Sequence, residues 1–435
     1  ERLARTTDDS PHLIVEARAG TGKTTTLIEG LKRLKGQPTP GFVPSPQQQA
    51  VFDCIELSRG KVSSICFVAF NKSIAAELKS RVPAGCEAST MHGMGFKAVT
   101  RAIRLNNSNA VNQDRTQKIV EEITGKDVWE LRRTSSALLG AVTKLVSLCK
   151  MNLVSANEDI GDGIEPWMGW EEQLSALASH YDVELDGVRD QVFDLVPQVL
   201  ARCLDVQKDG FIDFDDMIWL PVVLDLPMTK YDLLLVDEAQ DLNRCQQALA
   251  KKAGRRLILC GDPKQAIYGF AGADADSMPR MAKELEGCVT LPLTVTRRCG
   301  KAIVAEAKRI VPDFDAFETN GEGLISEARY PTEKSGRERD GVNYTTSVQD
   351  GDMVLCRVNA PLVSQCFRFL KMGRRANIQG RDIGQGLISL VKKLGKDDQD
   401  VPKLVAKISE WGDKETAKEN AKKFPSDARL IAISD

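Results

Sequence analysis

The sequence predicts an α/β protein in which parallel sheets are flanked by helices and a helical insertion interrupts the first sheet. Three features support this fold class. Apolar runs typical of buried strands lie at 13–15, 64–70, 233–236 and 257–260, and stretches with helical spacing separate them. Between residues 100 and 206 strand signals are scarce, and leucine and valine recur at three- and four-residue spacing. A chain of 435 residues is also too long to fold around one compact core, so we expect about two to four domains.

The first expected strand leads into a glycine-containing loop, Glu16-Ala17-Arg18-Ala19-Gly20-Thr21-Gly22-Lys23-Thr24-Thr25-Thr26, and then into a stretch compatible with a helix. Strand, loop and helix in this order are the context that a P-loop requires. Gly20 and Gly22 let backbone N–H groups point inward at a polyphosphate, and the helix dipole adds positive potential. Lys23 would reach the β- and γ-phosphates, and Thr24 would bind Mg²⁺. We therefore assign nucleotide binding to Gly20, Thr21, Gly22, Lys23, Thr24 and Thr25.

Acidic residues follow two of the later strands. Asp237 and Glu238 come after the run 233–236, and Asp262 follows 257–260. Open parallel sheets bind ligands at the carboxyl ends of their strands, so these residues point toward the same edge as the P-loop. Asp237 would hold Mg²⁺, and Glu238 would orient, or accept a proton from, the water that attacks the γ-phosphate. A solvated acidic turn is the alternative, and it fits the fully apolar preceding strand poorly.

The remaining elements are expected from spacing and turn residues. Asn71 is a suitable N-cap for the helix that follows it. Helices are predicted at 47–57, 72–81, 302–310 and 361–371, a strand at 353–356, a proline-rich connector at 36–46, a charged loop at 327–349 and a lysine- and acid-rich helical segment at about 395–426.

Composition limits the partners and the compartment. With 59 basic and 61 acidic residues the net charge is −2, so a nucleic-acid surface would have to be a local patch. The 11 cysteines form no Cys-x-x-Cys pair, which favours free thiols in a reducing compartment over disulfides or a zinc site. We find no signal peptide and no long apolar span. We therefore expect a cytoplasmic protein that is associated with the nucleoid, or a nuclear protein if the source is a eukaryote. We expect no membrane partner.

Six segments, taken in order, resemble the serial motifs of superfamily 1 helicases of the UvrD/Rep type over roughly the first 300 residues. They are Ala-Gly-Thr-Gly-Lys-Thr at 19–24, Phe-Asn-Lys at 70–72, Thr-Met-His-Gly at 90–93, Asp-Phe-Asp-Asp at 213–216, Asp-Glu-Ala-Gln-Asp at 237–241 and Gly-Asp…Gln-Ala-Ile-Tyr-Gly-Phe at 261–270. The resemblance implies RecA-like P-loop NTPase domains that use ATP and Mg²⁺. It also implies movement 3′ to 5′ along single-stranded DNA and unwinding of duplex. Ala17, which replaces the glycine of the general P-loop pattern, is what this family usually has.

The resemblance extends to further residues of the ATP site. Gln265 resembles the glutamine that senses the γ-phosphate. Arg298 falls where the family places an arginine from the second RecA-like domain, which would neutralise transition-state charge; a surface arginine is the alternative. Arg297 stands where the family commonly has a tyrosine that stacks on adenine, and a guanidinium plane can also stack on a base. The stretch 45–49 resembles the family's adenine-reading glutamine motif, but it lies after the P-loop and receives no role.

On the DNA side, Phe270 matches an aromatic residue on which the family stacks a base of single-stranded DNA. Tyr268, Phe70, Asn71, Lys72 and His92 lie in segments that resemble strand-contacting turns. A core position for Phe270 and a structural role for His92 remain alternatives. The partners implied are single-stranded DNA, duplex–single-strand junctions and a replication or repair protein.

The resemblance also divides the chain. Residues 1–100 and 207–293 would form the first RecA-like domain, 101–206 a helical insertion, and 294–435 an incomplete second RecA-like domain with the small helical segment at about 395–426. The chain starts at Glu1 and stops before the family's Thr-x-His-x-x-Lys-Gly-Leu-Glu and final arginine motifs, so we expect a longer gene product. The alternatives are a binding module that grips DNA or protein without moving, and a P-loop enzyme of another class such as a nucleotide kinase.

Overall fold

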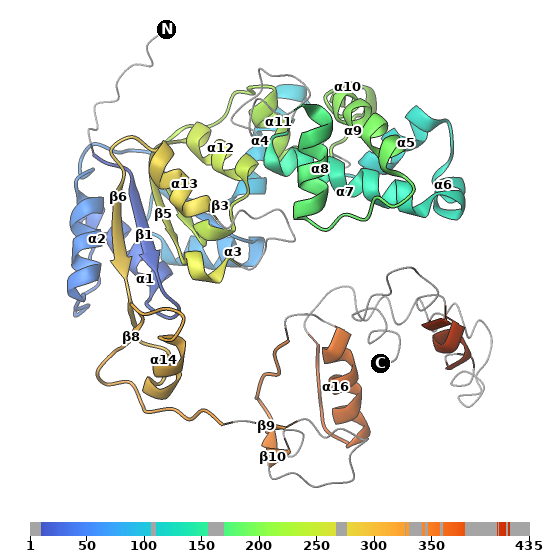
Figure 1. The fold of residues 1–435 in the computed structure, drawn as a ribbon. Coiled ribbons are helices and arrows are strands. Elements are labelled where there is room, and N and C mark those ends of the chain that lie inside the picture. Colours follow the sequence, from blue (N-terminus) through green and yellow to red (C-terminus); the bar gives the residue numbers. More distant parts are fainter. Residues whose placement is uncertain are drawn as a thin grey trace. The chain divides into compact units, whose positions relative to one another are not determined.

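The computed structural model describes residues 10–105, 110–154, 169–266, 276–326, 328–329, 342–343, 347–356, 360–378, 407, 409–414 and 416–417. The chain divides into two compact units, Glu1–Leu324 and Ile325–Asp435, and each is described by itself. Figure 1 shows the helices and strands coloured along the sequence.

The first unit is built on a sheet that has six strands among the described residues, in the order β3-β2-β4-β5-β1-β6. Every neighbouring pair in this sheet is parallel. The parallel sheet, flanked by helices, confirms the predicted α/β fold class. Its strands are β1 (Leu13–Ala17), β2 (Ile65–Ala69), β3 (Cys86–Thr90), β4 (Tyr231–Asp237), β5 (Gly254–Gly261) and β6 (Val289–Leu293).

Alternate residues of the central strands face two different cores. In β4, Leu234 and Val236 pack into one apolar cluster, and Leu233 and Leu235 pack into the other. Continuous apolar strands of this kind are expected when helices cover both faces of a parallel sheet. The sheet is therefore the middle layer of three.

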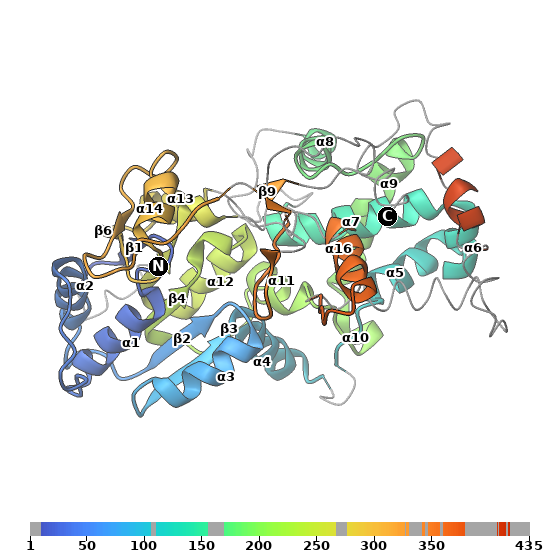
Figure 2. The same cartoon turned by 90° about the horizontal axis from the view of Figure 1, so that it is seen from below.

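Helices cover the two faces of the sheet, as Figure 1 and Figure 2 show from two directions. Asn71 caps α3 by accepting a hydrogen bond from the Ile74 N–H, as predicted. One face carries α1 (Lys23–Leu34), α2 (Pro46–Glu56) and α3 (Lys72–Arg81), and the other carries α4 (Met91–Ile103), α11 (Asp216–Val223), α12 (Arg244–Ala253) and α13 (Ser277–Glu284).

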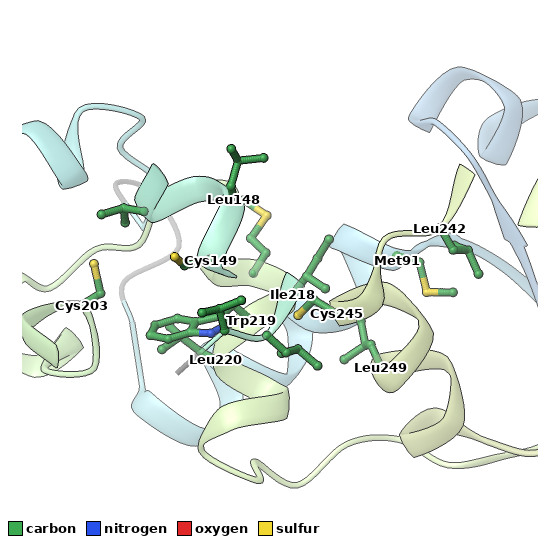
Figure 3. Close-up of a cluster of buried hydrophobic side chains, with 14 of the residues drawn as sticks. Met91, Leu148, Cys149, Cys203, Ile218, Trp219, Leu220, Leu242, Cys245 and Leu249 are labelled. Carbon is green, nitrogen blue, oxygen red and sulfur yellow. The ribbon is translucent and has the colours of Figure 1, made fainter. Parts of the chain in front are cut away.

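The insertion between α4 and α11 is helical, as the spacing of its leucines and valines predicts. Helix α7 lies at its centre and packs against α5, α6, α8 and α9. Figure 3 shows α7, through Leu148 and Cys149, in one apolar cluster with Trp219 of α11 and Leu249 of α12, so the insertion shares a core with the sheet. The helices are α5 (Arg115–Thr124), α6 (Val128–Thr134), α7 (Ser136–Asn152), α8 (Trp170–His180), α9 (Arg189–Cys203) and α10 (Val206–Asp209).

A buried group of charges fastens the insertion to the turn before α11. The Nζ atom of Lys150 lies 2.8 Å from a carboxylate oxygen of Asp213 and 2.8 Å from one of Asp216. Arg115 pairs with the other oxygen of Asp216 at 2.5 Å and donates a second hydrogen bond to the Cys203 carbonyl. Burial opposes the charge of Lys150, but the two carboxylates outweigh this effect and raise its pKa well above the usual value.

The segment 294–320 also belongs to the first unit. Its strands β7 (Val295–Thr296) and β8 (Asp315–Ala316) pair in parallel, and α14 (Lys301–Ala307) lies between them in the sequence. Gln47 of α2 holds the segment, since its amide bonds both the hydroxyl and the backbone N–H of Thr294 at 2.9 Å. The unit therefore ends at Leu324, beyond the boundary at residue 293 that we expect from the sequence. The assignment of 294–435 to a second RecA-like domain stays a prediction.

In the second unit the described residues include α16 (Ala360–Lys371), which confirms the predicted helix, and a parallel pair of β9 (Ala328–Arg329) and β10 (Val342–Asn343). The predicted strand at 353–356 is wrong, because this stretch is irregular and Met353 and Leu355 are 75% and 81% exposed. An apolar run becomes a strand only beside a partner strand, and none of the described residues pairs with it. Most of the predicted segments 327–349 and 395–426 lies outside the described residues.

The cysteines are free thiols, as predicted. Burial is the main cause that raises the pKa of the Cys66 thiol, to about 12, so this group acts as a small apolar side chain. In the part of the chain that the structure describes, no helix is both long and apolar enough to span a membrane.

We expect Lys150→Met to lower the free energy of unfolding by about 3–5 kcal/mol, because it leaves two buried carboxylates without one of their cations. Urea denaturation followed by circular dichroism measures this. The control is Arg81→Met, which breaks an exposed ion pair with Glu77 on α3 and should cost less than about 1 kcal/mol. Equal losses in the two variants would contradict the role given to the buried charges.

Candidate functional site

The loop after β1 has the backbone that a P-loop requires. Gly20 and Gly22 have φ angles of +69° and +86°, in the left-handed region that glycine adopts without strain. Gly22 is the N-cap residue of α1, which begins at Lys23. A β-carbon on Gly20 would lie 2.6 Å from both the Arg298 Cβ and the Thr296 hydroxyl, so glycine is needed there for space as well. The loop thus places a helix N-terminus, which favours anions, at the carboxyl edge of the sheet.

The first two residues of α1 contact the two acidic residues at the end of β4. Lys23 Nζ lies 2.6 Å from Glu238 Oε2, and Thr24 donates a hydrogen bond of 2.5 Å to Asp237 Oδ2. Burial opposes the charge on Lys23, but its contact with Glu238 outweighs this and raises its pKa. Burial raises the pKa of Asp237, against the hydrogen bond from Thr24. The fold therefore brings together the lysine, threonine and carboxylates that the sequence assigns to one site.

Glu238 is held in a strained backbone conformation. Its φ and ψ of 54° and 42° are left-handed, which costs about 1–3 kcal/mol for a residue with a side chain unless its surroundings fix it. Gln240 contributes to fixing it, because the Gln240 amide donates to Glu238 Oε2 at 3.0 Å. The side-chain oxygen Oε1 of Gln240 in turn accepts a hydrogen bond of 3.0 Å from the Asp262 N–H. The Glu238 carboxylate is thus pre-oriented by the neighbouring strand end.

Gln265 lies in the 3₁₀ turn Pro263–Gln265 that follows β5. Its amide donates to Asp262 Oδ2 at 2.7 Å, so the side chain is anchored at the same sheet edge as Glu238. Tyr268 and Phe270, predicted to contact DNA, lie outside the described residues.

Arg297 and Arg298 lie beside the P-loop within the first unit. The Arg297 N–H donates to the Gly20 carbonyl at 2.9 Å, and the Arg297 guanidinium stacks on the Phe317 ring, 3.9 Å from its centroid. The Arg298 N–H donates to the Thr296 hydroxyl. The family resemblance implies that Arg298 comes from a second domain, whereas the structure places it in the compact unit of the P-loop. The contacts of these arginines with nucleotide stay predictions.

A groove of about 820 Å³ in the first unit is lined by residues of α3, α4 and α11, among others. The predicted DNA-contact residues in the described part, Phe70, Asn71, Lys72 and His92, all line it. Phe214 lines it as well, with its ring centroid 4.0 Å from that of His92. Burial lowers the pKa of His92 to about 4, so this imidazole is neutral at pH 7. The groove therefore gathers aromatic surface from segments far apart in the sequence.

The groove and the carboxylates share a wall. A small pocket of about 20 Å³ is lined by Asp237 and Glu238 together with Phe70 and His92, which also line the groove. Asp241 lines both this pocket and the large groove. Burial, followed by the charge of Glu238, raises the pKa of Asp241 to about 6.

Sequence reasoning missed several of these residues. Phe214 belongs to the acidic motif at 213–216 and has no predicted role, although a large apolar side chain flanked by aspartates is an available signal. Lys79 and Lys97 also line the groove, although their positions on α3 and α4 gave no sign of it. Gln48 donates to the Thr26 hydroxyl at 3.0 Å, so the glutamine stretch without an assigned role contacts the P-loop helix.

Comparison with known proteins gives consistent matches. The family model for the UvrD/REP helicase N-terminal domain matches residues 48–286. F-box DNA helicase protein 1 of Schizosaccharomyces pombe is 25% identical over 270 residues, which are 60% of this chain and 27% of that protein. DNA helicase II of Escherichia coli is 24% identical over 319 residues, 69% of this chain and 38% of that protein. ATP-dependent DNA helicase PcrA of Bacillus subtilis is 25% identical over 328 residues, 70% and 38% of the two chains. The chain thus spans 27–38% of the length of these relatives.

Gly261→Ala tests whether β5 must approach Gln240 closely. The new β-carbon would lie 2.3 Å from Gln240 Oε1 and 2.8 Å from Met278 Sδ. We expect the free energy of unfolding, measured by urea denaturation, to fall by about 1–3 kcal/mol. In the control Gly140→Ala, inside α7, the new β-carbon would meet nothing within 4 Å. The free energy of unfolding of this variant should rise by about 0.5–1 kcal/mol. A neutral Gly261→Ala would contradict the close packing at this strand end.

Proposed function

We propose that this chain, which belongs to the UvrD/Rep helicase family, hydrolyses ATP to move 3′ to 5′ along single-stranded DNA and to unwind duplex. The observation that carries the proposal is the common wall between the P-loop carboxylates and the aromatic groove. The matching relatives support it, since their names describe them as DNA helicases. The 3′ to 5′ direction rests on family resemblance.

Lys23 would change partners when nucleotide binds. Its ammonium pairs with Glu238 at 2.6 Å, and the phosphates of ATP would offer acceptors of higher charge beside the N-terminus of α1. Movement of Lys23 to the phosphates would release Glu238. Binding of the substrate would thereby activate the base.

Thr24 and Asp237 fit a magnesium ion by the chemistry of their donors. A hydroxyl and a carboxylate oxygen lie 2.5 Å apart there, and both are hard oxygen ligands. Proteins commonly hold Mg²⁺ with one or two carboxylates together with substrate phosphates. Thr24 and Asp237 would accordingly hold the ion together with the phosphates of ATP. When bound, the ion would neutralise charge on the phosphate oxygens.

Glu238 would accept a proton from the water whose oxygen attacks the γ-phosphorus, while the bond to the β–γ bridging oxygen breaks to give ADP and phosphate. Gln240 would keep the Glu238 carboxylate aimed during this step. Gln265 would contact the γ-phosphate, and the charge of Arg298 would stabilise the transition state. The Arg297 plane, which stacks on Phe317 here, would offer a stacking surface to the base.

The groove suits single-stranded DNA. Phe70 and Phe214 are 47% and 49% exposed within it and would stack on bases, a sequence-tolerant contact. Lys72, Lys79 and Lys97 would meet the backbone phosphates. This local patch gives a DNA surface to a chain whose net charge is −2. We further propose duplex–single-strand junctions as substrates, a replication or repair protein as partner, and the cytoplasm, with the nucleoid, or the nucleus as location.

Movement of the DNA would be coupled to hydrolysis through the wall that the two sites share. Glu238 precedes the 3₁₀ turn Ala239–Asp241, and Asp241, the last residue of this turn, lines the groove. A change of partner at Glu238 is thus one short turn away from the DNA surface. This is a physical route for coupling that needs no distant relay.

ATP hydrolysis with and without single-stranded DNA tests the proposal. We expect DNA to stimulate turnover, and Lys23→Ala and Glu238→Gln each to lower kcat by about 10²–10³-fold, because each removes a charged group that acts in the transition state. The control is Glu77→Gln, which removes one partner of the exposed ion pair on α3 and should leave kcat unchanged. DNA binding without any nucleotide turnover, alike in all variants, would instead establish a non-translocating binding module.

The groove is tested by fluorescence anisotropy with labelled oligonucleotides. Phe214→Ala and Phe70→Ala should each weaken binding by the about 1–3 kcal/mol of one base stack, or about 5- to 150-fold in Kd. Trp129→Ala, on α6 and 79% exposed, is the matched control outside the groove and should leave Kd unchanged. Wild-type affinity in both groove variants would place the DNA elsewhere.

A further inference from the structure

Arg18 is a charged P-loop residue to which the reaction described above gives no role. Its side chain is 11% exposed and contacts two carboxylates at once. One guanidinium nitrogen lies 3.0 Å from Asp262 Oδ1, another lies 2.8 Å from Asp313 Oδ2, and the Nε atom lies 3.1 Å from the same Asp313 oxygen. The planar fork of arginine suits such a double contact, which an ammonium group cannot reproduce with the same geometry.

The first carboxylate leads to the predicted catalytic side chains. Asp262 is 3% exposed, and its other oxygen accepts the Gln265 amide at 2.7 Å. The Asp262 N–H donates to Gln240, which in turn holds Glu238. Arg18 is therefore connected to Gln265 through one residue and to Glu238 through two.

The second carboxylate leads to the segment that carries Arg298. Asp313 precedes β8, and β8 is joined to β7 because the Asp315 N–H donates to the Thr294 carbonyl and the Phe317 N–H to the Thr296 carbonyl. At the other end of β7, Arg297 donates to Gly20 of the P-loop. Arg18 and Gly20 thus hold the segment 294–320 on the P-loop at two points.

We propose that Arg18 is a positioning residue for ATP hydrolysis: its guanidinium fixes Gln265 through Asp262 and fixes the arginine-bearing segment 294–320 through Asp313. The inference rests on the proposed ATPase activity. The hydrogen bond from Arg18, together with its charge, lowers the pKa of Asp313, so the contact is present throughout the neutral range. The residue orders both partners of the γ-phosphate before nucleotide arrives.

The kinetic test uses Arg18→Ala, Arg18→Lys and Asp313→Asn at saturating single-stranded DNA. Asp313 is 47% exposed and Arg18 keeps its pair with Asp262 when Asp313 is replaced, so this variant keeps the test valid if Arg18→Ala folds poorly. We expect Arg18→Ala and Asp313→Asn to lower kcat about 10- to 100-fold with KM for ATP within about twofold of wild type. Arg18→Lys should recover part of the loss. The control Glu306→Gln, from an exposed pair on α14, should leave both constants unchanged.

Hydrogen exchange of the nucleotide-free protein provides a second readout that does not depend on turnover. The Arg297, Asp315 and Phe317 amides, which are hydrogen-bonded in this segment, should exchange about tenfold faster in Asp313→Asn and Arg18→Ala than in wild type. Unchanged exchange rates of these amides in the two variants overturn the inference, whether or not kcat falls. If wild type itself shows no turnover, the proposed function fails, while exchange still decides whether Arg18 holds the segment.

Discussion

The site depends on the parallel pairing of the strands, which brings their carboxyl ends level at one edge. Val15 of β1 pairs with Cys260 of β5, and Cys260 pairs with Asp237 of β4. On the other side of β4, Val236 pairs with Val68 of β2. A P-loop, two carboxylates, an anchored glutamine and the turn at Phe70 therefore emerge side by side. A slip of one residue in β4 would turn Asp237 and its neighbours to the opposite faces and disperse the site.

Residue type and local spacing were sufficient to predict the α/β fold class and four of the six strands that the structure describes in the sheet, β1, β2, β4 and β5. The glycines of the P-loop, the apolar strands before Asp237 and Asp262 and the cap at Asn71 are local signals, because each reflects a backbone requirement within a few residues. The predicted strand at 353–356 is wrong because strand formation also depends on contacts that are not local. Its apolar run satisfies the local pattern, but pairing depends on a partner strand that no local pattern specifies.

The features that could not be predicted from the sequence are contacts between residues that lie far apart in the sequence. Phe214 meets His92 only because α11 returns from the insertion to pack on α4, where Gly95 lets the Met217 carbonyl come close. The position of Arg298 in the unit of the P-loop follows from contacts such as Gln47 with Thr294. Neither contact leaves a mark on composition or spacing. The buried pairs of Lys150 and Arg115 are similar, since their partners lie in a turn that is distant in sequence.

The position of the first strand has a consequence for biosynthesis. Of the six described strands of this sheet β1 leaves the ribosome first, yet both of its neighbours, β5 and β6, begin only at Gly254 and Val289. At about 5–20 residues per second, the intervening chain takes on the order of tens of seconds to make. Its apolar residues 13–15 must wait that long for their pairing partners, exposed to chaperones and to wrong neighbours. The P-loop is thus the first part of the site to be translated and among the last to be assembled.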